Sequence, residues 1–292
     1  MARSLVTIDV GAIRHNARTL AARAAPAELW AVVKADGYGH GAAAAGRAAV
    51  EGGATALCVA TAAEGLQLRA AGDEGRILVL GPTAEDDVRR AREASLELTV
   101  PDERLPDGVP VHLKLDTGMG RWGLSELGAP GRSVVGLMSH LATSESDPDF
   151  ARQQLRRFLA ATEPYAERYV RHIASSAAAL DLPEARLDAV RCGIALYGVD
   201  PYGDDATSHG LRPALRWESE VEQVKLLEPG ASTGYGRRFV ATERTWLGLV
   251  PVGYADGFRR DLTGTEVLVD GERARVVGTV SMDAIAVRLP RR

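Results

Sequence analysis

The chain has little of several features that define particular classes of protein. Its 292 residues include only 2 cysteines, Cys58 and Cys192, each within an apolar stretch, so neither a disulfide framework nor a C-x-x-C zinc or redox site is expected. No apolar run approaches the roughly 18 residues of a membrane-spanning helix, and the N-terminus has charges where a secretory signal has its apolar core. We therefore expect a cytoplasmic protein whose two cysteines are reduced and packed in the interior.

An excess of positive charge is absent as well. The 35 lysines and arginines are outnumbered by 39 aspartates and glutamates, and charges of both signs alternate along the chain. Nucleic acids and anionic membranes bind to a basic face, so we predict neither as a partner. The histidines show no metal-ligand spacing, so we predict no metal site and interpret His112, His172 and His209 as structural or surface residues.

Strand-like apolar runs alternate with helical patterns through most of the chain. Asp9 is the predicted N-cap of a first helix, in which Ile13, Ala17 and Leu20 recur at helical spacing. Strands are expected at residues 29–33, 56–60, 76–80, 96–100, 111–115, 134–140 and 169–174, and further helices at about 42–51, 62–71, 84–93 and 149–168. This alternation is typical of βα units around a parallel sheet, either a closed barrel or an open doubly wound sheet.

A polar residue or a glycine follows each strand-like run, and this favours the barrel. Barrel enzymes build their sites from residues at the C-terminal ends of the strands. The residues in these positions are Lys34, Thr61, Gly81, Asp116, His140, Ser175 and Arg191. The connection "PDERLPDGVP" (101–110) has ten residues with three prolines, which is short for a helical crossover, and "GMGRWGLSELGAPGR" (118–132) is nearly as poor in helix. We predict an α/β fold of the (β/α)8 TIM-like barrel type in which some outer helices are reduced.

The chain changes character near Pro213. Beyond it, strand-like runs and glycine-rich turns follow one another without an amphipathic helix, and "DGE" (270–272) is typical of a tight hairpin. We predict a barrel domain over residues 1–212, whose first strand could join the second domain, and a smaller, mostly β domain over residues 213–292.

The stretch "AVVKADGYGHG" (31–41) holds the most distinctive candidate for chemistry. Lys34 stands just past a predicted strand, and a lysine at the mouth of a barrel can form a Schiff base with pyridoxal phosphate once its pKa is lowered. Gly37, Gly39 and Gly41 would let a phosphate or a ring approach the backbone, and Tyr38 could reach the same phosphate. Taken alone, however, a lysine after a strand is more often a solvated or salt-bridged strand end.

This stretch closely resembles the cofactor-lysine motif of the alanine racemases, which typically reads A-V-V-K-A-N/D-A-Y-G-H-G. Further segments agree with the same family in order along the chain. They are "KLDTGMGR" (114–121), "SHLATSESD" (139–147), "RHIASSAA" (171–178), "VRCGIALYG" (190–198), "STGYGRRF" (232–239), "VPVGYADG" (250–257) and "SMD" (281–283). Ordered matches over most of the chain identify it as similar to this family.

The resemblance implies a barrel joined to a β domain, a pyridoxal 5′-phosphate cofactor, and a head-to-tail homodimer in which the partner's β domain completes each site. It also implies an amino-acid substrate and the interconversion of L- and D-alanine by two bases. Lys34 would carry the cofactor and act on one face of the substrate, and Tyr235 of the partner would act on the other. Because a phenol has a reference pKa of about 10, Tyr235 needs a neighbouring cation or hydrogen bond, for which His140 is the candidate.

The resemblance also assigns the remaining site residues. Arg191 matches the arginine that donates to the pyridine nitrogen and keeps that nitrogen unprotonated. Arg121 matches a residue on the substrate-carboxylate side, and Lys114 matches a lysine that is often carbamylated and then orients this arginine. Tyr254 and the backbone N–H of Met282 match groups of the partner that bind the substrate carboxylate. The residues that match the cofactor site are Lys34, Tyr38, His140, Ser176, Arg191, Gly193 and Ile194, and a hydroxyl with backbone amides suits a phosphate dianion.

Members of the family usually continue beyond the segment that ends here in "AVRLPRR", and their tail carries a further tyrosine near the cofactor and a loop at the entrance. We therefore expect a compact member with a more open entrance, or with another residue in place of that tyrosine. Other interpretations stay open. They are a broad-specificity or serine racemase of the same fold, a degenerate inactive relative, a non-enzymatic pyridoxal phosphate-binding homeostasis protein, which would lack the β domain, and an α/β scaffold without a cofactor.

Overall fold

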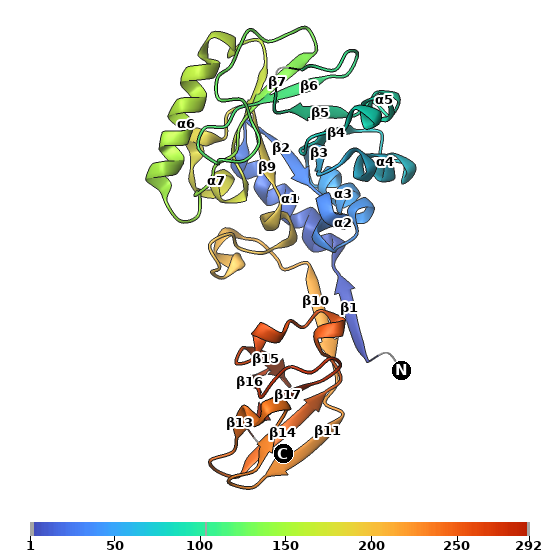
Figure 1. The fold of residues 1–292 in the computed structure, drawn as a ribbon, viewed down its shortest axis with the longest axis vertical. Helices are drawn as coiled ribbons and strands as arrows, with labels where there is room; N and C mark the ends of the chain where they lie inside the picture. The colour runs from blue at the N-terminus through green and yellow to red at the C-terminus, as the bar shows by residue number, and fades with distance from the viewer. Residues whose placement is uncertain (1–2, 103, 291–292) are drawn as a thin grey trace. The chain divides into compact units, whose positions relative to one another are not determined.

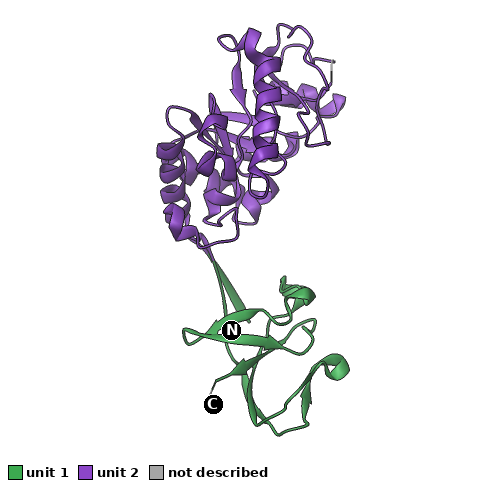
Figure 2. Cartoon of the chain, turned by 90° about the vertical axis from the view of Figure 1, so that its left-hand side faces the viewer, with its two compact units in different colours: residues 1–7, 216–292 green, residues 8–215 purple. Residues whose placement is uncertain are grey.

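The computed structural model describes residues 3–102 and 104–290 and divides the chain into two compact units (Figure 2). Unit 1 comprises Met1–Thr7 and Arg216–Arg292, and unit 2 comprises Ile8–Leu215. Each unit has a hydrophobic core of its own. Among the described residues, no helix has both the length and the apolar character that crossing a membrane requires.

Unit 2 is built on an eight-stranded parallel sheet, which is visible in the upper part of Figure 1. In sheet order the strands are β8 (Val170–His172), β7 (Val134–Met138), β6 (Val111–Lys114), β5 (Glu97–Val100), β4 (Arg76–Val79), β3 (Ala54–Val59), β2 (Glu28–Val32) and β9 (Ala189–Cys192). Backbone hydrogen bonds from Asp188 N–H to Arg171 O (3.1 Å) and from Arg191 N–H to Ala174 O (3.0 Å) bring the outer strands β8 and β9 together. The sheet is therefore a nearly closed barrel, and the fold class predicted from the sequence is confirmed.

Helices join the barrel strands and carry small residues where they pack on the sheet. The helices are α1 (Val10–Ala24), α2 (Lys34–Tyr38), α3 (Ala42–Glu51), α4 (Ala62–Ala70), α5 (Glu85–Glu93), α6 (Pro148–Thr162) and α7 (Ser176–Asp181). Asp9 caps α1, as predicted, by accepting from the N–H of Ala12 at 3.0 Å. A Cβ added to Gly65 of α4 would lie 2.8 Å from Leu96, so α4 approaches the sheet closely. The helix predicted at 149–168 ends at Thr162, because Pro164 has no N–H to continue it.

Two of the seven connections between successive barrel strands lack an outer helix. No helix lies among the described residues between β5 and β6 (101–102 and 104–110) or between β6 and β7 (115–133). Both connections run as turns and irregular loops, as their prolines and glycines predict. The reduction of the fourth and fifth outer helices is confirmed.

The interior of the barrel is apolar on one side and polar on the other. Successive residues of a strand point to opposite faces, so Leu29 and Ala31 of β2 pack in the main core while Trp30 and Val32 lie in a separate inner cluster. On β5, β6, β8 and β9 the corresponding inward positions hold Glu97, Thr99, His112, Lys114, His172 and Arg191. Most of the inward polar side chains therefore lie in one half of the barrel, and Glu28 of β2 and Arg76 of β4 add to them at the N-terminal ends of their strands.

Unit 1 is an antiparallel β structure. A two-stranded sheet joins β1 (Ser4–Ile8) and β10 (Leu215–Ser219), and a five-stranded sheet has the order β11 (Gln223–Leu227), β14 (Thr245–Val250), β17 (Ile285–Leu289), β16 (Glu272–Val277) and β15 (Glu266–Val269). A small hairpin pairs β12 (Ser232–Thr233) with β13 (Phe239–Val240). Asp270 and Gly271 both have positive φ (51° and 82°), which is the two-residue turn predicted from "DGE".

Candidate active site

A cavity of about 760 Å³ lies at the C-terminal ends of the barrel strands in unit 2. It receives side chains from the ends of β2, β6, β7 and β9 and from the loops that follow β3, β4 and β8. The sequence-predicted residues that line it are Lys34, Tyr38, Arg121, His140, Ser176, Arg191, Gly193 and Ile194. The fold therefore gathers every site residue predicted in this unit around one space, which is where barrel proteins carry their sites.

Lys34 begins α2, which is a single left-handed turn. Its followers Ala35, Asp36, Gly37 and Tyr38 all have φ between 51° and 64°. A left-handed conformation costs a non-glycine residue roughly 1–2 kcal/mol, so local preference does not favour this turn. Strain of this kind persists only where the surrounding structure imposes it, and here it falls on the residues that directly follow Lys34.

The carboxylate of Glu64, on α4, holds this turn in place. It accepts hydrogen bonds from the N–H groups of Ala35 (2.8 Å) and Ala60 (2.6 Å), and it forms a capping box with Thr61. Asp36 provides a second tie by accepting from the N–H of Ala42, at the start of α3 (2.8 Å). The turn after Lys34 is thus fixed by the two helices that flank it.

The glycines of this stretch have a different role from the one predicted. Gly37, Gly39 and Gly41 all adopt positive φ, and none is among the described residues that line the cavity. A Cβ on Gly37 would lie 3.2 Å from the backbone of Ala42, so this glycine lets α3 approach the turn. The three glycines allow the backbone to take this conformation. Of the residues after Lys34 in the motif (35–41), only Tyr38 lines the cavity.

Arg191 projects from β9 and is almost completely buried, with 4% of its surface exposed. Its guanidinium donates to the carbonyl of Ser139 (2.7 Å), to Nδ1 of His172 (2.5 Å) and, at 3.3 Å, to Nδ1 of His140 and the carbonyl of Ile173. Burial lowers the pKa of Arg191 to about 10, which leaves the side chain positively charged at neutral pH. These contacts fix the direction of a cation that also borders the cavity.

His140 is an uncharged hydrogen-bond donor. Burial, together with the positive charges of Arg191 and Lys114, lowers its pKa to about 3. Because Nδ1 accepts from Arg191, the proton of the neutral ring lies on Nε2. His140 therefore cannot supply the cation considered for a neighbouring phenol, but it can supply a hydrogen bond.

The cavity is strongly cationic. The described residues that line it include four cationic side chains, Lys34, Lys114, Arg121 and Arg191, against the single carboxylate of Glu145. Burial and the neighbouring Arg121 lower the pKa of Lys114 to about 8. Trp122 lies beside both groups, with its ring centroid 5.7 Å from the Lys114 amine and 5.5 Å from the Arg121 guanidinium. Positive charge in a partly desolvated space attracts anionic groups such as phosphate and carboxylate.

One wall of the cavity forms a cradle of hydroxyl and amide groups. The Ser176 hydroxyl, at the start of α7, accepts from the N–H groups of Gly193 (3.1 Å) and Ala195 (3.3 Å). A Cβ on Gly193 would lie 2.5 Å from the Tyr38 hydroxyl, so only a glycine leaves room for that tyrosine. Burial raises the pKa of Tyr38, which keeps its hydroxyl protonated and able to donate. The cradle suits an oxyanion.

The three predicted residues of unit 1 lie on neighbouring exposed loops. Tyr235, Tyr254 and Met282 have 74%, 41% and 57% of their surfaces exposed. The loop of Tyr254 is joined to that of Met282 by a hydrogen bond from Tyr254 N–H to Ser281 O (3.0 Å), and Thr279 donates to the carbonyl of Tyr235 (2.8 Å). Unit 1 thus presents two phenols and a thioether together at its surface.

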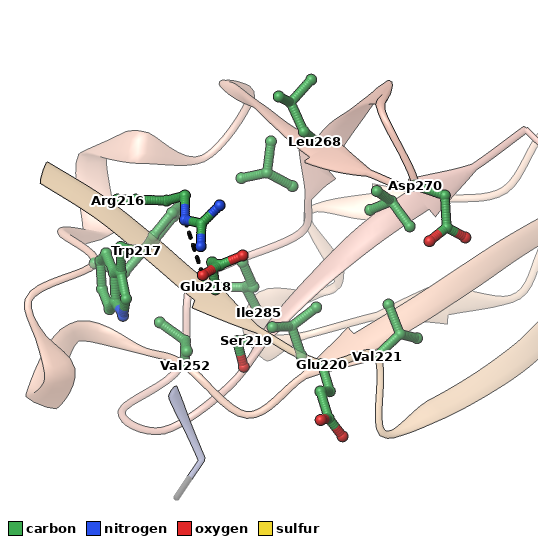
Figure 3. Close-up of a pocket in the computed structure, with 14 residues that line it drawn as sticks. Arg216, Trp217, Glu218, Ser219, Glu220, Val221, Val252, Leu268, Asp270 and Ile285 are labelled. Carbon is green, nitrogen blue, oxygen red and sulfur yellow. Dashed lines mark ion pairs between the residues drawn. The ribbon is translucent and has the colours of Figure 1, made fainter. Parts of the chain in front are cut away.

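A second cavity of about 720 Å³ lies within unit 1 and has a different character (Figure 3). Valines, Ile285, Leu268 and Trp217 provide most of its side chains, with Arg216 and Glu218 paired at 3.0 Å. Its described lining contains no lysine, histidine, tyrosine or cysteine. Its carboxylates, Glu218, Glu220 and Asp270, could accept protons, but the described lining holds no amine that could form a Schiff base.

Some features of the site were not expected from the sequence. His172, interpreted as a structural or surface residue, contacts Arg191 directly, and Trp122 borders the cavity. Asp116 follows β6, as the barrel pattern predicts, but its carboxylate accepts from Gly118 and Gly120 in a local turn and borders a different hollow. Among the described residues, no group of three or more histidine, cysteine or acidic side chains is arranged to hold a metal ion.

Fold and cavity together define a barrel enzyme with an anion-accepting site at the C-terminal ends of its strands and a β unit that follows the barrel. Comparison with known sequences makes the assignment specific. The family model "Alanine racemase, N-terminal domain" matches residues 8–201, and "Alanine racemase, C-terminal domain" matches residues 214–292. The chain belongs to the alanine racemase family, as its motifs indicate.

Individual relatives agree with this assignment along the whole chain. The alanine racemase of Listeria monocytogenes serotype 4b (strain CLIP80459) is 39% identical over 310 residues, which cover 98% of this chain and 84% of the relative. That of Symbiobacterium thermophilum is 40% identical over 310 residues, which cover 97% of this chain and 82% of the relative. The crystal structure of the biosynthetic alanine racemase from Pseudomonas aeruginosa superposes with a TM-score of 0.91 at 34% identity, covering 100% of this chain and 88% of that one.

Proposed function

We propose that this protein is a pyridoxal 5′-phosphate-dependent racemase that interconverts L- and D-alanine, and that it works as a homodimer with shared active sites. The observation that carries the proposal is the meeting of the Lys34 amine, the buried Arg191 guanidinium and the Ser176–Gly193 cradle around one cationic cavity. Family membership supports the same reaction.

The residues around the cavity fit this cofactor. The Tyr38 and Ser176 hydroxyls and the N–H of Ile194 would donate to the phosphate. Gly193 would complete this cradle, because its N–H donates to the Ser176 oxygen and leaves the Ser176 proton free, and because a side chain there would fill the space. Lys34 would bind the aldehyde carbon through its amine. Arg191, which stays protonated at neutral pH, would donate to the ring nitrogen and keep that nitrogen unprotonated. When bound, the cofactor supplies a conjugated ring that withdraws electrons from the substrate's α-carbon and makes its proton acidic.

Racemisation needs one proton donor or acceptor on each face of the α-carbon, because a single base returns the proton to the face from which it came. Lys34 would move the proton on one face. Tyr235 of the partner subunit would do so on the other, and its exposure on unit 1 is consistent with such a contact. His140 supports this role because its Nε2–H can donate to the phenol oxygen and stabilise the phenolate.

The substrate carboxylate would be held by charge and by partner loops. Arg121 borders the cavity and presents a guanidinium that suits a carboxylate. Tyr254 and the backbone N–H of Met282, both of the partner subunit, would add hydrogen bonds from the loops that carry Tyr235. A cation on the barrel and donors on the partner would together fix the plane of the carboxylate.

The cofactor is tested by colour. The purified protein should be yellow, and Lys34→Ala should remove the absorption band while the matched variant Lys225→Ala, on an exposed strand of unit 1, keeps it.

L-alanine should be converted to D-alanine, and Tyr235→Phe should slow this conversion far more than Tyr165→Phe. A coloured protein that racemises neither alanine nor serine would contradict the proposal and favour a carrier of the cofactor, whereas faster turnover of serine would change the substrate assignment.

The shared site is tested by mixing inactive variants. Lys34→Ala and Tyr235→Phe subunits, combined and allowed to exchange, should regain part of the activity, because one of the two sites in a mixed dimer has both bases intact. A mixture that stays inactive after confirmed subunit exchange would exclude the shared arrangement.

A further inference from the structure

A line of buried polar side chains crosses the barrel interior from Arg191 towards the N-terminal end of the strands. Arg191 donates to Nδ1 of His172 (2.5 Å), and Nε2 of His172 lies 2.8 Å from Nδ1 of His112. Nε2 of His112 lies 2.8 Å from the carboxylate of Glu97, the first residue of β5. Both histidines are fully buried, so these ring nitrogens have one another as partners in place of water.

The positions of the ring protons follow from the two ends of the line. An arginine only donates, so Nδ1 of His172 accepts and the proton of that ring lies on Nε2. This proton points to Nδ1 of His112, which leaves the proton of His112 on Nε2, directed at the carboxylate. Burial lowers the pKa of both histidines, so each ring carries one proton at neutral pH. Every donor in this line then meets an acceptor. Moving any one proton to the other nitrogen of its ring would place two donors or two acceptors opposite each other.

The carboxylate end is also fixed. Arg76 donates to the second oxygen of Glu97 at 2.7 Å. Burial alone would raise the pKa of Glu97, but the hydrogen bonds from His112 and Arg76 outweigh it and lower that pKa. The carboxylate therefore stays charged at neutral pH and continues to accept from His112.

The surrounding residues leave space for this line and shield it. A Cβ at Gly136 of β7 would lie 2.1 Å from Nδ1 of His112, so the ring fits only because that position is a glycine. The Trp30 ring lies 4.5 Å from the His172 ring and 5.6 Å from the His112 ring, centroid to centroid. The packing therefore leaves each ring little freedom to turn away from its neighbour in the line.

We propose that Glu97 and His112 are positioning residues for Arg191. By fixing His172 as an acceptor, they commit one guanidinium N–H to the barrel interior and hold the guanidinium plane so that its free N–H groups face the cavity. The inference rests on the proposed function in one respect, because the consequence for turnover requires Arg191 to contact the bound ring. The positions of the ring protons depend only on residues of this chain and not on a bound cofactor.

The first test is made on the unaltered, cofactor-free protein and needs no variant. NMR of nitrogen-labelled histidine should find both rings protonated at Nε2 and unprotonated at Nδ1, with no titration from about pH 5 to about pH 8, where an ordinary histidine changes charge. Protonation of either ring at Nδ1, or titration within this range, would overturn the proposal.

The second test replaces the carboxylate by an amide of the same shape. An amide offers one acceptor and one donor, so Glu97→Gln can satisfy His112 or Arg76 but not both, and the His112 and His172 rings should become mixtures of tautomers. In the cofactor-loaded enzyme, kcat should fall roughly 10- to 100-fold while KM for alanine changes little. The reason is that a displaced Arg191 guanidinium would misplace the bound ring at which the reaction occurs. The matched control is Glu28→Gln, since Glu28 also approaches Arg76 (3.8 Å) but hydrogen-bonds to Trp30 and Thr55.

The outcomes separate this inference from the proposed function. Unchanged tautomers in Glu97→Gln, or altered tautomers with an unchanged kcat, would overturn the positioning role. Tautomers that shift as expected in a protein that never racemises alanine would support the proton arrangement and refute the proposed function. An equal fall of kcat in Glu28→Gln would show that any loss of charge near Arg76 suffices, and would also overturn the proposal.

Discussion

Gly193 offers a direct test of the phosphate cradle. Replacing it by alanine puts a methyl carbon 2.5 Å from the Tyr38 hydroxyl and 3.0 Å from the adjoining ring carbon. The φ of Gly193 is −109°, so alanine meets no left-handed strain there. The contact is with the end of a side chain whose ring lies 5.1 Å from that of Tyr197, so we expect the Tyr38 hydroxyl to move out of the cradle while the fold is retained.

The size of the effect follows from the donor that is lost. A hydrogen bond to a charged group contributes about 1.5–3 kcal/mol, and each 1.4 kcal/mol is about tenfold in affinity, so Gly193→Ala should weaken cofactor binding roughly 10- to 100-fold. Tyr38→Phe removes the same donor and should have a similar effect. In the Tyr38→Phe background the added methyl no longer meets an oxygen, so the second change should weaken binding by no more than about threefold.

The assay is a titration of cofactor-free protein with pyridoxal 5′-phosphate, followed by absorbance, beside a thermal melt of each variant. Gly128→Ala is the matched control, because a Cβ there meets no heavy atom within 4 Å and the residue does not line the cavity. Unchanged affinity in Gly193→Ala would refute the cradle, and strictly additive losses in the double variant would show that Tyr38 and Gly193 act independently.

Three further results are expected. Asn16→Leu should lower the free energy of unfolding by about 3–5 kcal/mol in a urea titration, because the buried Asn16 side chain donates to the carbonyls of Leu196 and Arg212 and accepts from the N–H of Arg212. A loss below about 1 kcal/mol would contradict this. Asp9→Ala should cost about 1 kcal/mol in the same assay through loss of the α1 cap, and Asp9→Asn should recover most of it. Lys114 should form a carbamate with isotope-labelled carbon dioxide, giving an NMR signal that is absent in Lys114→Met and grows as the pH rises towards about 8, because burial lowers the amine's pKa to that value and only the uncharged amine reacts.

The barrel could be predicted from the sequence because its strands are covered on both faces. Strands of this kind appear as unbroken apolar runs, and the polar residues that end them, such as Lys34 and His140, mark the C-terminal edge where the cavity lies. The missing helices could be predicted for a similar local reason, since prolines and a short connection exclude them. These signals all lie within a few residues of the feature they predict.

The polar line inside the barrel could not be predicted in the same way. Glu97, His112 and His172 stand on three different strands, and whether they touch depends on the stagger of those strands in the barrel; His172 is also 60 residues from His112 in sequence. A single polar residue within an apolar run is the only local sign, and it does not identify a partner. Asp116 shows the opposite case, because a local turn with Gly118 and Gly120 overrides the barrel pattern.

The left-handed turn after Lys34 has a consequence for the order of events in assembly. Its backbone is unfavourable on its own, and the ties that hold it come from Glu64 of α4 and from the start of α3. An isolated peptide of residues 28–41 should therefore not adopt it, and the lysine should reach its working environment only after both helices have docked. Binding of a ligand to Lys34 would then indicate that α3 and α4 have both docked on the barrel.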